Sequence, residues 1–551
     1  MPTSLVMLPS FLAARHRPNK FALCARLAKR SMSIVPLRLF HPTMKVLFLY
    51  AFWLFTVIPA RAQAPSRMSG MAYRAEVAGT TSSGRFAPQW FTAGRYGLSS
   101  SEPHFGYVRG AVERSIENDS LRLWRLGYGF DMALAAGLPS VFIPQQYYAA
   151  VEYRGFRLTA GCREMEMELK NDALSSGGMT FSDNARPIPQ LRLAIPEWKN
   201  ISRHARMVWL KAHAAYGMMT DGHWIEDFAG GRGQTANLFT RRVLYHSKAA
   251  YFRFGNPERF PLNFTLGLEM VAQFGGEAWN VRQRAGSTQE IAQSEKMPTG
   301  LKAFWHALIP GGSDVNDGDF SNVQGNQLGS WNLSLDWTAD DWSARTYLDH
   351  YFEDHSQMFI QYGWRDMLLG FEVKPPKNPI VDGVVYEFMH TTDQSGPVYH
   401  DATSEFPIQI SGADMYYNHH VYGCYQHWGM VLGNPLIVSP IYNGDAASGN
   451  VNGGKLFTYH SRIVAHHLGL SGAPVPGVQW RALLSYQKSL GIYTVPVTPM
   501  HQTSWMLEAA YTPVRQKAWS FKVALAGHYG DILGNSTGAS FSVCHSGLIF
   551  K

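Results

Sequence analysis

The sequence is poor in charged residues and in cysteine. Only 16% of its 551 residues are charged, whereas soluble proteins normally carry about a quarter. Of four cysteines, Cys162, Cys424 and Cys544 follow the first 62 residues, far apart and without CxxC spacing, which argues against a disulfide framework or a zinc ribbon. Aromatic residues reach 13%, and Tyr and Trp rings suit a lipid–water boundary as well as a sugar-binding surface.

Acidic residues are absent from residues 1–62, which hold nine of the 49 Lys and Arg residues. The rest of the chain has 40 basic and 41 acidic residues, so it lacks the net positive charge expected of a nucleic-acid binder. An apolar run over 46–58, preceded by Lys45 and followed by small residues, predicts a signal peptide over 44–62, cleaved after Ala62. Residues 1–43 are interpreted as an upstream extension from a start site assigned too early, with a mitochondrial-type presequence as the alternative.

Beyond Ala62 the sequence has no apolar run of about 18 residues, so a helical membrane anchor is not expected. Apolar and polar residues instead alternate with a period of two in long segments, which predicts strands. The segments are 124–134, 262–274, 331–337, 342–348, 478–486, 505–511 and 519–525. The turn at 339–341 makes the third and fourth a hairpin.

A soluble sandwich also alternates, but here the strands are long, the alternate face is rich in Gly and charge, and an export signal precedes them. We therefore predict an all-β fold, a transmembrane antiparallel β-barrel over residues 63–551. The terminus Leu548-Ile549-Phe550-Lys551 is similar to the assembly signal of bacterial outer-membrane barrels, with the Phe penultimate. Outer-membrane lipid and the barrel-assembly machinery are the partners that this fold implies.

Three segments depart from alternation. Residues 289–308 place Leu301, Phe304, Trp305 and Leu308 at helical spacing before a Pro-Gly-Gly stop, which predicts a short helix. Residues 310–328 and 374–418 are polar, contain Gly and Pro, and are predicted to be long loops.

Several motifs resemble the capsule-assembly Wzi family. The signature is SSGGMTFSDNARPIPQ at 175–190, and further similar stretches are GNQLGSW at 325–331, WRD at 364–366, VYE at 385–387, TDQSGP at 392–397, YYNH at 416–419 and GNPL at 433–436. The resemblance implies an outer-membrane barrel of about eighteen strands, with a small helical element at its periplasmic side or plugging the lumen. It also implies a lectin that helps to attach capsular polysaccharide to the cell surface, without a catalytic centre.

The motifs supply candidate contacts for a glycan, because rings pack on the CH face of sugars while amides and carboxylates bind hydroxyls. The candidates are Arg186, Trp364, Arg365, Asp366, Asp393, Gln394, Tyr416, Tyr417, Asn418 and His419. The alternative is a set of loops that pack their own aromatics. Arg186 lies in a stiff Arg-Pro-Ile-Pro segment and either faces an acidic sugar or, as we favour, anchors the segment through a salt bridge.

No metal site, cofactor or enzymatic activity is predicted. Asp314, Asn316, Asp317 and Asp319 distantly resemble a calcium loop without its bidentate Glu, which favours a polar turn. The pairs His419-His420 and His466-His467 would point to opposite faces of a strand. HExxH, GxSxG and GK[ST] motifs are missing. Two rival functions remain at this stage, a diffusion porin and a barrel hydrolase acting on lipid or glycan.

Overall fold

The computed structural model describes residues 70–550 except 120, 203–205, 234–235, 257, 283–290, 310–324, 354–357, 359–363, 401–402, 409, 411 and 444–452. The predicted signal peptide over 44–62 and the calcium-like residues over 314–319 lie outside the described residues.

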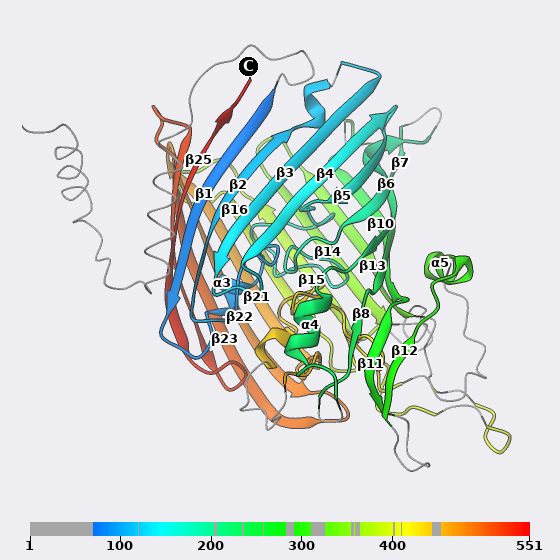
Figure 1. Cartoon of the computed structure of the whole chain (residues 1–551). Coiled ribbons are helices and arrows are strands. Elements are labelled where there is room, and N and C mark those ends of the chain that lie inside the picture. Colours follow the sequence, from blue (N-terminus) through cyan, green and yellow to red (C-terminus); the bar gives the residue numbers. More distant parts are fainter. Residues whose placement is uncertain are drawn as a thin grey trace, which may run out of the picture.

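Eighteen strands form one closed antiparallel barrel (Figure 1). Each strand pairs with the next barrel strand along the chain, and β1 pairs with β25 to close the ring. The strands are β1 (Met71–Ser82), β2 (His104–Arg114), β3 (Trp124–Ala136), β4 (Phe142–Tyr153), β5 (Phe156–Cys162), β6 (Gln190–Asn200), β7 (Val208–Met218), β9 (Leu244–Phe254), β10 (Leu262–Phe274), β13 (Asn326–Thr338), β14 (Ser343–Glu353), β15 (Met367–Lys374), β16 (Gly383–His390), β21 (Ile463–Val475), β22 (Val478–Gly491), β23 (Pro496–Tyr511), β24 (Trp519–Gly530) and β25 (Ser536–Leu548). The predicted fold class, strands and hairpin are confirmed.

The outer face of the barrel is apolar. In β3, Trp124, Phe130 and Leu134 are exposed, while Asp131 and Ala133 between them are buried inside the barrel. The same alternation exposes Leu507 on β23 and Leu525 on β24. A largely apolar outer surface is favourable in lipid and costly in water, so the barrel spans a membrane. Within the described residues, every helix is too short or too polar to cross a membrane.

The two ends of the barrel differ in the length of their connections. Where β1 begins and β25 ends, here named the terminal end, the turns are short, as at 154–155, 339–342 and 476–477. At the opposite end, here named the loop end, the chain makes the long connections 163–189, 219–243 and 391–462. Outer-membrane barrels place short turns in the periplasm and long loops outside the cell.

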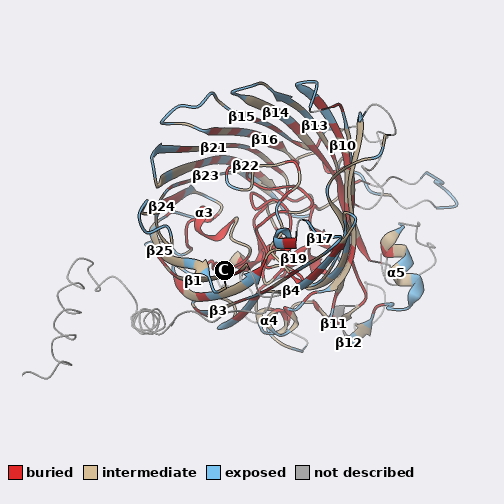
Figure 2. Cartoon of the chain, turned by 90° about the horizontal axis from the view of Figure 1, so that it is seen from above, coloured by how far each residue is buried: buried red, intermediate tan, exposed pale blue. Residues whose placement is uncertain are grey.

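All but one of the remaining elements belong to the connections at the loop end. They are β8 (Phe239–Arg241), β11 (Glu277–Arg282), β12 (Ile291–Lys296), β17 (Asn418–His419), β18 (Gly423–Cys424), β19 (Gln426–His427), β20 (Met430–Val431), the helices α3 (Gln89–Thr92), α4 (Gly222–Phe228) and α5 (Leu301–Leu308), and 3-10 turns at Pro440–Asn443 and, at the terminal end, Ile116–Asp119. Helix α5 confirms the predicted helix over Leu301–Leu308, whereas residues 291–296 of the same predicted segment form strand β12. The helical content is small, and of the three α-helices α3 lies inside the ring of strands (Figure 2).

One predicted loop is wrong in part. The segment 374–418 was expected to be a loop throughout, but residues 383–390 form barrel strand β16. Val385, Glu387 and Met389 point inward and are buried, while Tyr386 is exposed on the outer face. The strand is only eight residues long and lies between polar loops, so its alternation is too short to stand out. Of the predicted loop at 310–328, β13 takes the residues from Asn326 onward, and 310–324 lies outside the described residues.

Three connections fill the lumen and are here named the plug: residues 83–103, 163–189 and 412–443. They join one another through hydrogen bonds, as from Ser182 Oγ to the Gly433 carbonyl (2.6 Å) and from Gln89 Nε2 to the Pro435 carbonyl (3.1 Å). Figure 2 shows buried chain across the inside of the ring. The largest apolar cluster combines plug residues such as Met179 with wall residues such as Tyr351, so the main core lies inside the barrel.

Candidate functional site

The signature segment 175–190 lies in the plug and reaches across the lumen. It connects to β5 and β6, but its polar groups bind β16, which lies on the opposite wall in the strand order. Ser175 Oγ donates to Glu387 Oε1 (2.6 Å) and the Ser176 amide donates to Glu387 Oε2 (2.7 Å). Tyr347 of β14 donates to the same carboxylate (2.6 Å). Glu387 is 1% exposed, so this carboxylate fixes the signature segment to the wall.

Arg186 is buried beneath an indole ring. Its guanidinium lies 4.3 Å from the ring centre of Trp428, and its Nε donates to the Gly97 carbonyl (3.4 Å). Burial lowers its pKa to about 10. Among the described residues Arg186 forms no ion pair, so stacking and a carbonyl hold it, and the predicted salt bridge is not observed. Because it is 5% exposed, it is also not presented to a sugar.

Asp366 organises the start of the longest connection. Its fully buried carboxylate accepts hydrogen bonds from the amides of Asp393 (3.0 Å) and Gln394 (2.6 Å). The Tyr416 hydroxyl (2.9 Å) and His390 Nδ1 (3.2 Å) complete its surroundings. Charge-assisted bonds of this kind offset the cost of burying a carboxylate. Asp366 therefore fastens residues 393–394 and the plug to the end of β15.

Four further candidates are also internal. Tyr417 is fully buried and donates to the Met179 carbonyl, and Asn418 exchanges two hydrogen bonds with the backbone of Thr458 (2.9 and 2.8 Å). His419 Nδ1 accepts from the Val421 amide (3.0 Å), and burial lowers the pKa of its ring to about 3. Burial also raises the pKa of Tyr416, with Asp366 adding to the effect. These side chains use their hydrogen-bonding groups inside the fold, so we assign them to holding the plug.

The remaining candidates reach the surface at the loop end. The Arg365 side chain is 72% exposed and pairs with Asp393 (3.0 Å), and Trp364 stacks on His350 with ring centres 4.6 Å apart. Two residues that the sequence reasoning missed join them. Tyr493 donates to the Asp393 carbonyl (2.7 Å) and its ring lies 3.8 Å beneath the Arg462 guanidinium.

We name Trp364, Arg365, Asp393, Arg462 and Tyr493 the loop-end cluster. Contacts from three connections join Arg365, Asp393, Arg462 and Tyr493, because β15, β16, β21 and β22 are consecutive in the barrel. Trp364 stacks on His350, which lies on the outer face of β14, and belongs to the cluster only as the chain neighbour of Arg365. Tyr493 was detectable only as an aromatic residue in the segment 487–504 between two predicted strands. Arg462 gives no comparable signal, because a single Arg before a strand is common.

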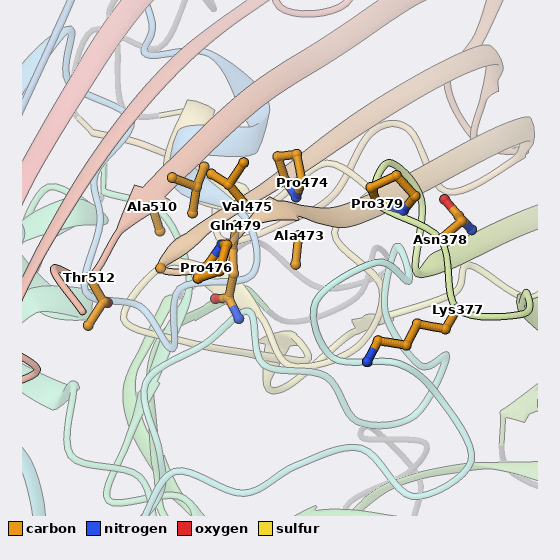
Figure 3. Close-up of a pocket in the computed structure, with 12 residues that line it drawn as sticks. Lys377, Asn378, Pro379, Ala473, Pro474, Val475, Pro476, Gln479, Ala510 and Thr512 are labelled. Carbon is orange, nitrogen blue, oxygen red and sulfur yellow. The ribbon is translucent and has the colours of Figure 1, made fainter.

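A pocket at the terminal end is the alternative location for a ligand (Figure 3). Its volume is about 660 Å³ and it is lined by Lys377, Asn378, Pro379, Ala473, Pro474, Val475, Pro476, Gly477, Val478, Gln479, Ala510 and Thr512. This lining is mainly proline and small apolar side chains and has no aromatic ring. The pocket therefore lacks the ring platforms on which sugars pack.

In the described part of the chain, no group of three or more His, Cys, Asp or Glu side chains is placed to hold a metal ion. Cys162 and Cys424 are free and buried. His466 and His467 do point to opposite faces, as predicted: His466 meets Tyr386 outside the barrel, while His467 binds the Leu174 carbonyl inside it.

The Asp366 anchor predicts a local effect of mutation. Asp366→Asn removes the charged acceptor of two amides, so the exchange of the Asp393 and Gln394 amides should rise about 5- to 150-fold, equivalent to about 1–3 kcal/mol. Hydrogen exchange followed by mass spectrometry measures it. Arg365→Ala is the matched control, because it removes only an exposed ion pair. Equal exchange in both variants would contradict the anchor.

Comparisons with known proteins give structural neighbours only. No protein-family model and no curated protein matches the sequence. Among solved structures, the chain is similar to Wzi, described as a carbohydrate-binding β-barrel involved in group 1 capsule assembly in Escherichia coli, with 14% identity, 95% of this chain and 92% of that chain covered, and a TM-score of 0.48. It is also similar to Pseudomonas aeruginosa OpdQ (10% identity, 88% and 99% covered, TM-score 0.42) and OprD (10% identity, 89% and 98% covered, TM-score 0.41).

Proposed function

We propose that this protein holds a surface polysaccharide, capsular or of another kind, at the loop end of an outer-membrane barrel. The observation that carries the proposal is the loop-end cluster, which combines two rings, two guanidinium groups and one carboxylate at the surface. The long connections that carry it face the outside of the cell if the barrel follows the usual orientation. The resemblance of the motifs to the Wzi family supports the same assignment.

The chemistry of the cluster favours an acidic glycan. Arg365 and Arg462 bring two positive charges against the single carboxylate of Asp393. Guanidinium groups bind carboxylates in a bidentate manner, and the partly exposed rings of Trp364 and Tyr493 offer faces for a sugar ring. Uronic acids or pyruvylated sugars are the classes that this combination suits.

Hydrogen bonds beneath the cluster hold it in a fixed geometry before a ligand binds. Asp366 fixes the backbone of Asp393 from below, and Tyr493 fixes the Asp393 carbonyl from the neighbouring turn. A site that is rigid before binding loses less entropy when the ligand arrives. The buried candidates thus contribute to glycan binding through the position of the exposed ones.

The plug argues against the rival function of a diffusion porin. An open pore needs a water-filled passage through the barrel, whereas here the main apolar cluster and the buried rings of Tyr351, Tyr416 and Tyr417 occupy the lumen. These rings pack edge to face, with centres 4.6 and 5.4 Å apart.

We therefore expect the purified protein to show no steady conductance in planar bilayers. Glu387→Gln weakens the attachment of the plug to the wall, and brief openings should become more frequent in this variant. Steady conductance of the unmodified protein would overturn the plugged state and favour the porin.

Glycan binding provides the direct test of the cluster. Trp364→Ala and Tyr493→Ala each remove one ring platform, so the affinity for the native polysaccharide should fall about 2- to 10-fold, as expected for the loss of about 0.5–1.5 kcal/mol. Glycan arrays or surface plasmon resonance measure it, and heat-modifiable mobility verifies that the barrel is folded. Gln479→Ala at the terminal end is the control. Unchanged binding in both ring variants would remove the cluster from the site.

An assay in cells tests whether the protein retains polysaccharide at the cell surface. Deletion of the gene should move polysaccharide from the cell-bound to the shed fraction, and an Arg365→Ala, Arg462→Ala double variant should restore retention only in part. If deletion leaves both fractions unchanged, the proposed role is wrong even where the purified protein binds glycan.

A further inference from the structure

Polar side chains on β7, β9 and β13 interrupt the lipid-facing surface of four consecutive strands, β7, β9, β10 and β13. Near the terminal end, the outer faces of β9 and β10 expose Phe252, Phe254 and Phe264. Continuing in steps of two along β9 toward the loop end, the same face carries Lys248 and His246. A lysine on the outer wall is costly in hydrocarbon unless its charge is satisfied.

The interruption continues sideways as one row. By strand register, His246 of β9 lies between Tyr216 of β7 and Ala272 of β10, and Ala272 pairs with Gln327 of β13. The Tyr216 and His246 rings have centres 4.4 Å apart, which places them on the same face. His246 and Ala272 are nevertheless buried, so another part of the chain covers this row.

Helix α5 is the cover. Figure 2 shows it outside the ring of strands, beside β10. Its Phe304 packs against Phe274 and Tyr216, with ring centres 5.1 and 5.2 Å away, and Ala307 is 1% exposed. One side of α5 is therefore docked on the outer wall.

Side chains of the polar row donate hydrogen bonds to the C-terminal end of α5. A helix leaves its last four carbonyls without intrahelical partners, and in α5 two side chains of the wall bind such carbonyls. Gln327 donates to the His306 carbonyl (2.8 Å) and Lys248 to the Ala307 carbonyl (2.9 Å), while Tyr216 donates to the Phe304 carbonyl just before them (2.8 Å). A cation at a helix C-terminus is also favoured by the helix dipole. The polar row thus supplies hydrogen bonds to the C-terminal end of α5, and α5 covers the polar row.

The other side of α5 is apolar and uncovered. Leu301 is 91% exposed, Trp305 59% and Ile309, just beyond the helix, 49%. Spacing of four residues places them on one stripe. A Leu and a Trp so exposed beside the lipid-facing belt continue the apolar surface that the polar row interrupts, and Trp is enriched at membrane interfaces.

We infer that α5 is an interfacial helix that lies in the lipid leaflet at the loop end, with Leu301 and Trp305 in the boundary between headgroups and acyl chains. It replaces the polar row by an apolar stripe and screens Lys248 and His246 from lipid. The inference concerns the membrane-facing wall and goes beyond polysaccharide binding.

The test places an environment-sensitive label on the stripe. Trp305→Cys or, as a second position, Leu301→Cys is labelled with NBD in a Cys544→Ser background, where Cys162 and Cys424 are buried. The labelled protein is reconstituted into phosphatidylcholine vesicles with or without brominated acyl chains. Phe264→Cys on the lipid-facing belt is the positive control, and the exposed Lys455→Cys on the 391–462 connection is the negative control. Heat-modifiable mobility verifies folding of each variant.

Brominated lipid should quench the labels at 301 and 305 at least half as strongly as the label at 264, and aqueous iodide should quench them less than the label at 455. Labels that behave like the one at 455 would overturn the inference, because α5 would then lie in water. Protection from both quenchers would overturn it as well, since a protein surface, such as a second copy of the chain, would then cover the stripe.

Discussion

The closure of the sheet by β1 and β25 is the constraint on which the rest of the structure depends. Their register runs from Ala72 opposite Leu548 to Ser82 opposite Gly538, so neither strand keeps an open edge within the membrane. In lipid, backbone groups without partners cost several kcal/mol each, and a closed ring removes this cost. Closure in turn divides every strand into an outer face for lipid and an inner face for the lumen. The apolar exterior, the polar interior and the need to fill that interior follow from it.

The lumen is filled by a repeated device, in which a buried carboxylate at the wall accepts a backbone amide of the plug. Glu387 accepts from Ser176 and Asp349 from Met179 (2.7 and 3.3 Å). Glu353 receives the Tyr417 amide in the same way (2.5 Å). Each bond satisfies an amide that would otherwise be buried without a partner and gives the carboxylate a donor. These hydrogen bonds hold the irregular segments of the plug in one conformation inside the lumen.

The barrel could be predicted from the sequence because its signal is local. Residues 262–274 alternate over their full length, and the structure forms β10 over the same residues. The plug could not be predicted in this way, since its contacts join distant positions: Tyr417 binds the Met179 carbonyl across 238 residues. The motifs at 364–366 and 416–419 therefore supplied candidate residues, but did not indicate that Tyr416 to His419 are buried while Arg365 is exposed. The pairing of Arg462 with Tyr493 arises only when β21 and β22 stand side by side.

The division between buried and exposed residues has a consequence for ligand exchange at the loop end. The ion pair between Arg365 and Asp393 is exposed on the Arg365 side, and such pairs contribute only about 0–1 kcal/mol to stability. Under the proposed function, Arg365 would leave Asp393 for a sugar carboxylate at little cost, while Asp366 keeps the Asp393 backbone in place. A carboxylate held by four protein donors, such as that of Asp366, offers no such freedom. The weak pair at the surface is thus the part of the cluster suited to release and rebind a charged chain, and the strong contacts beneath it keep the geometry constant while that happens.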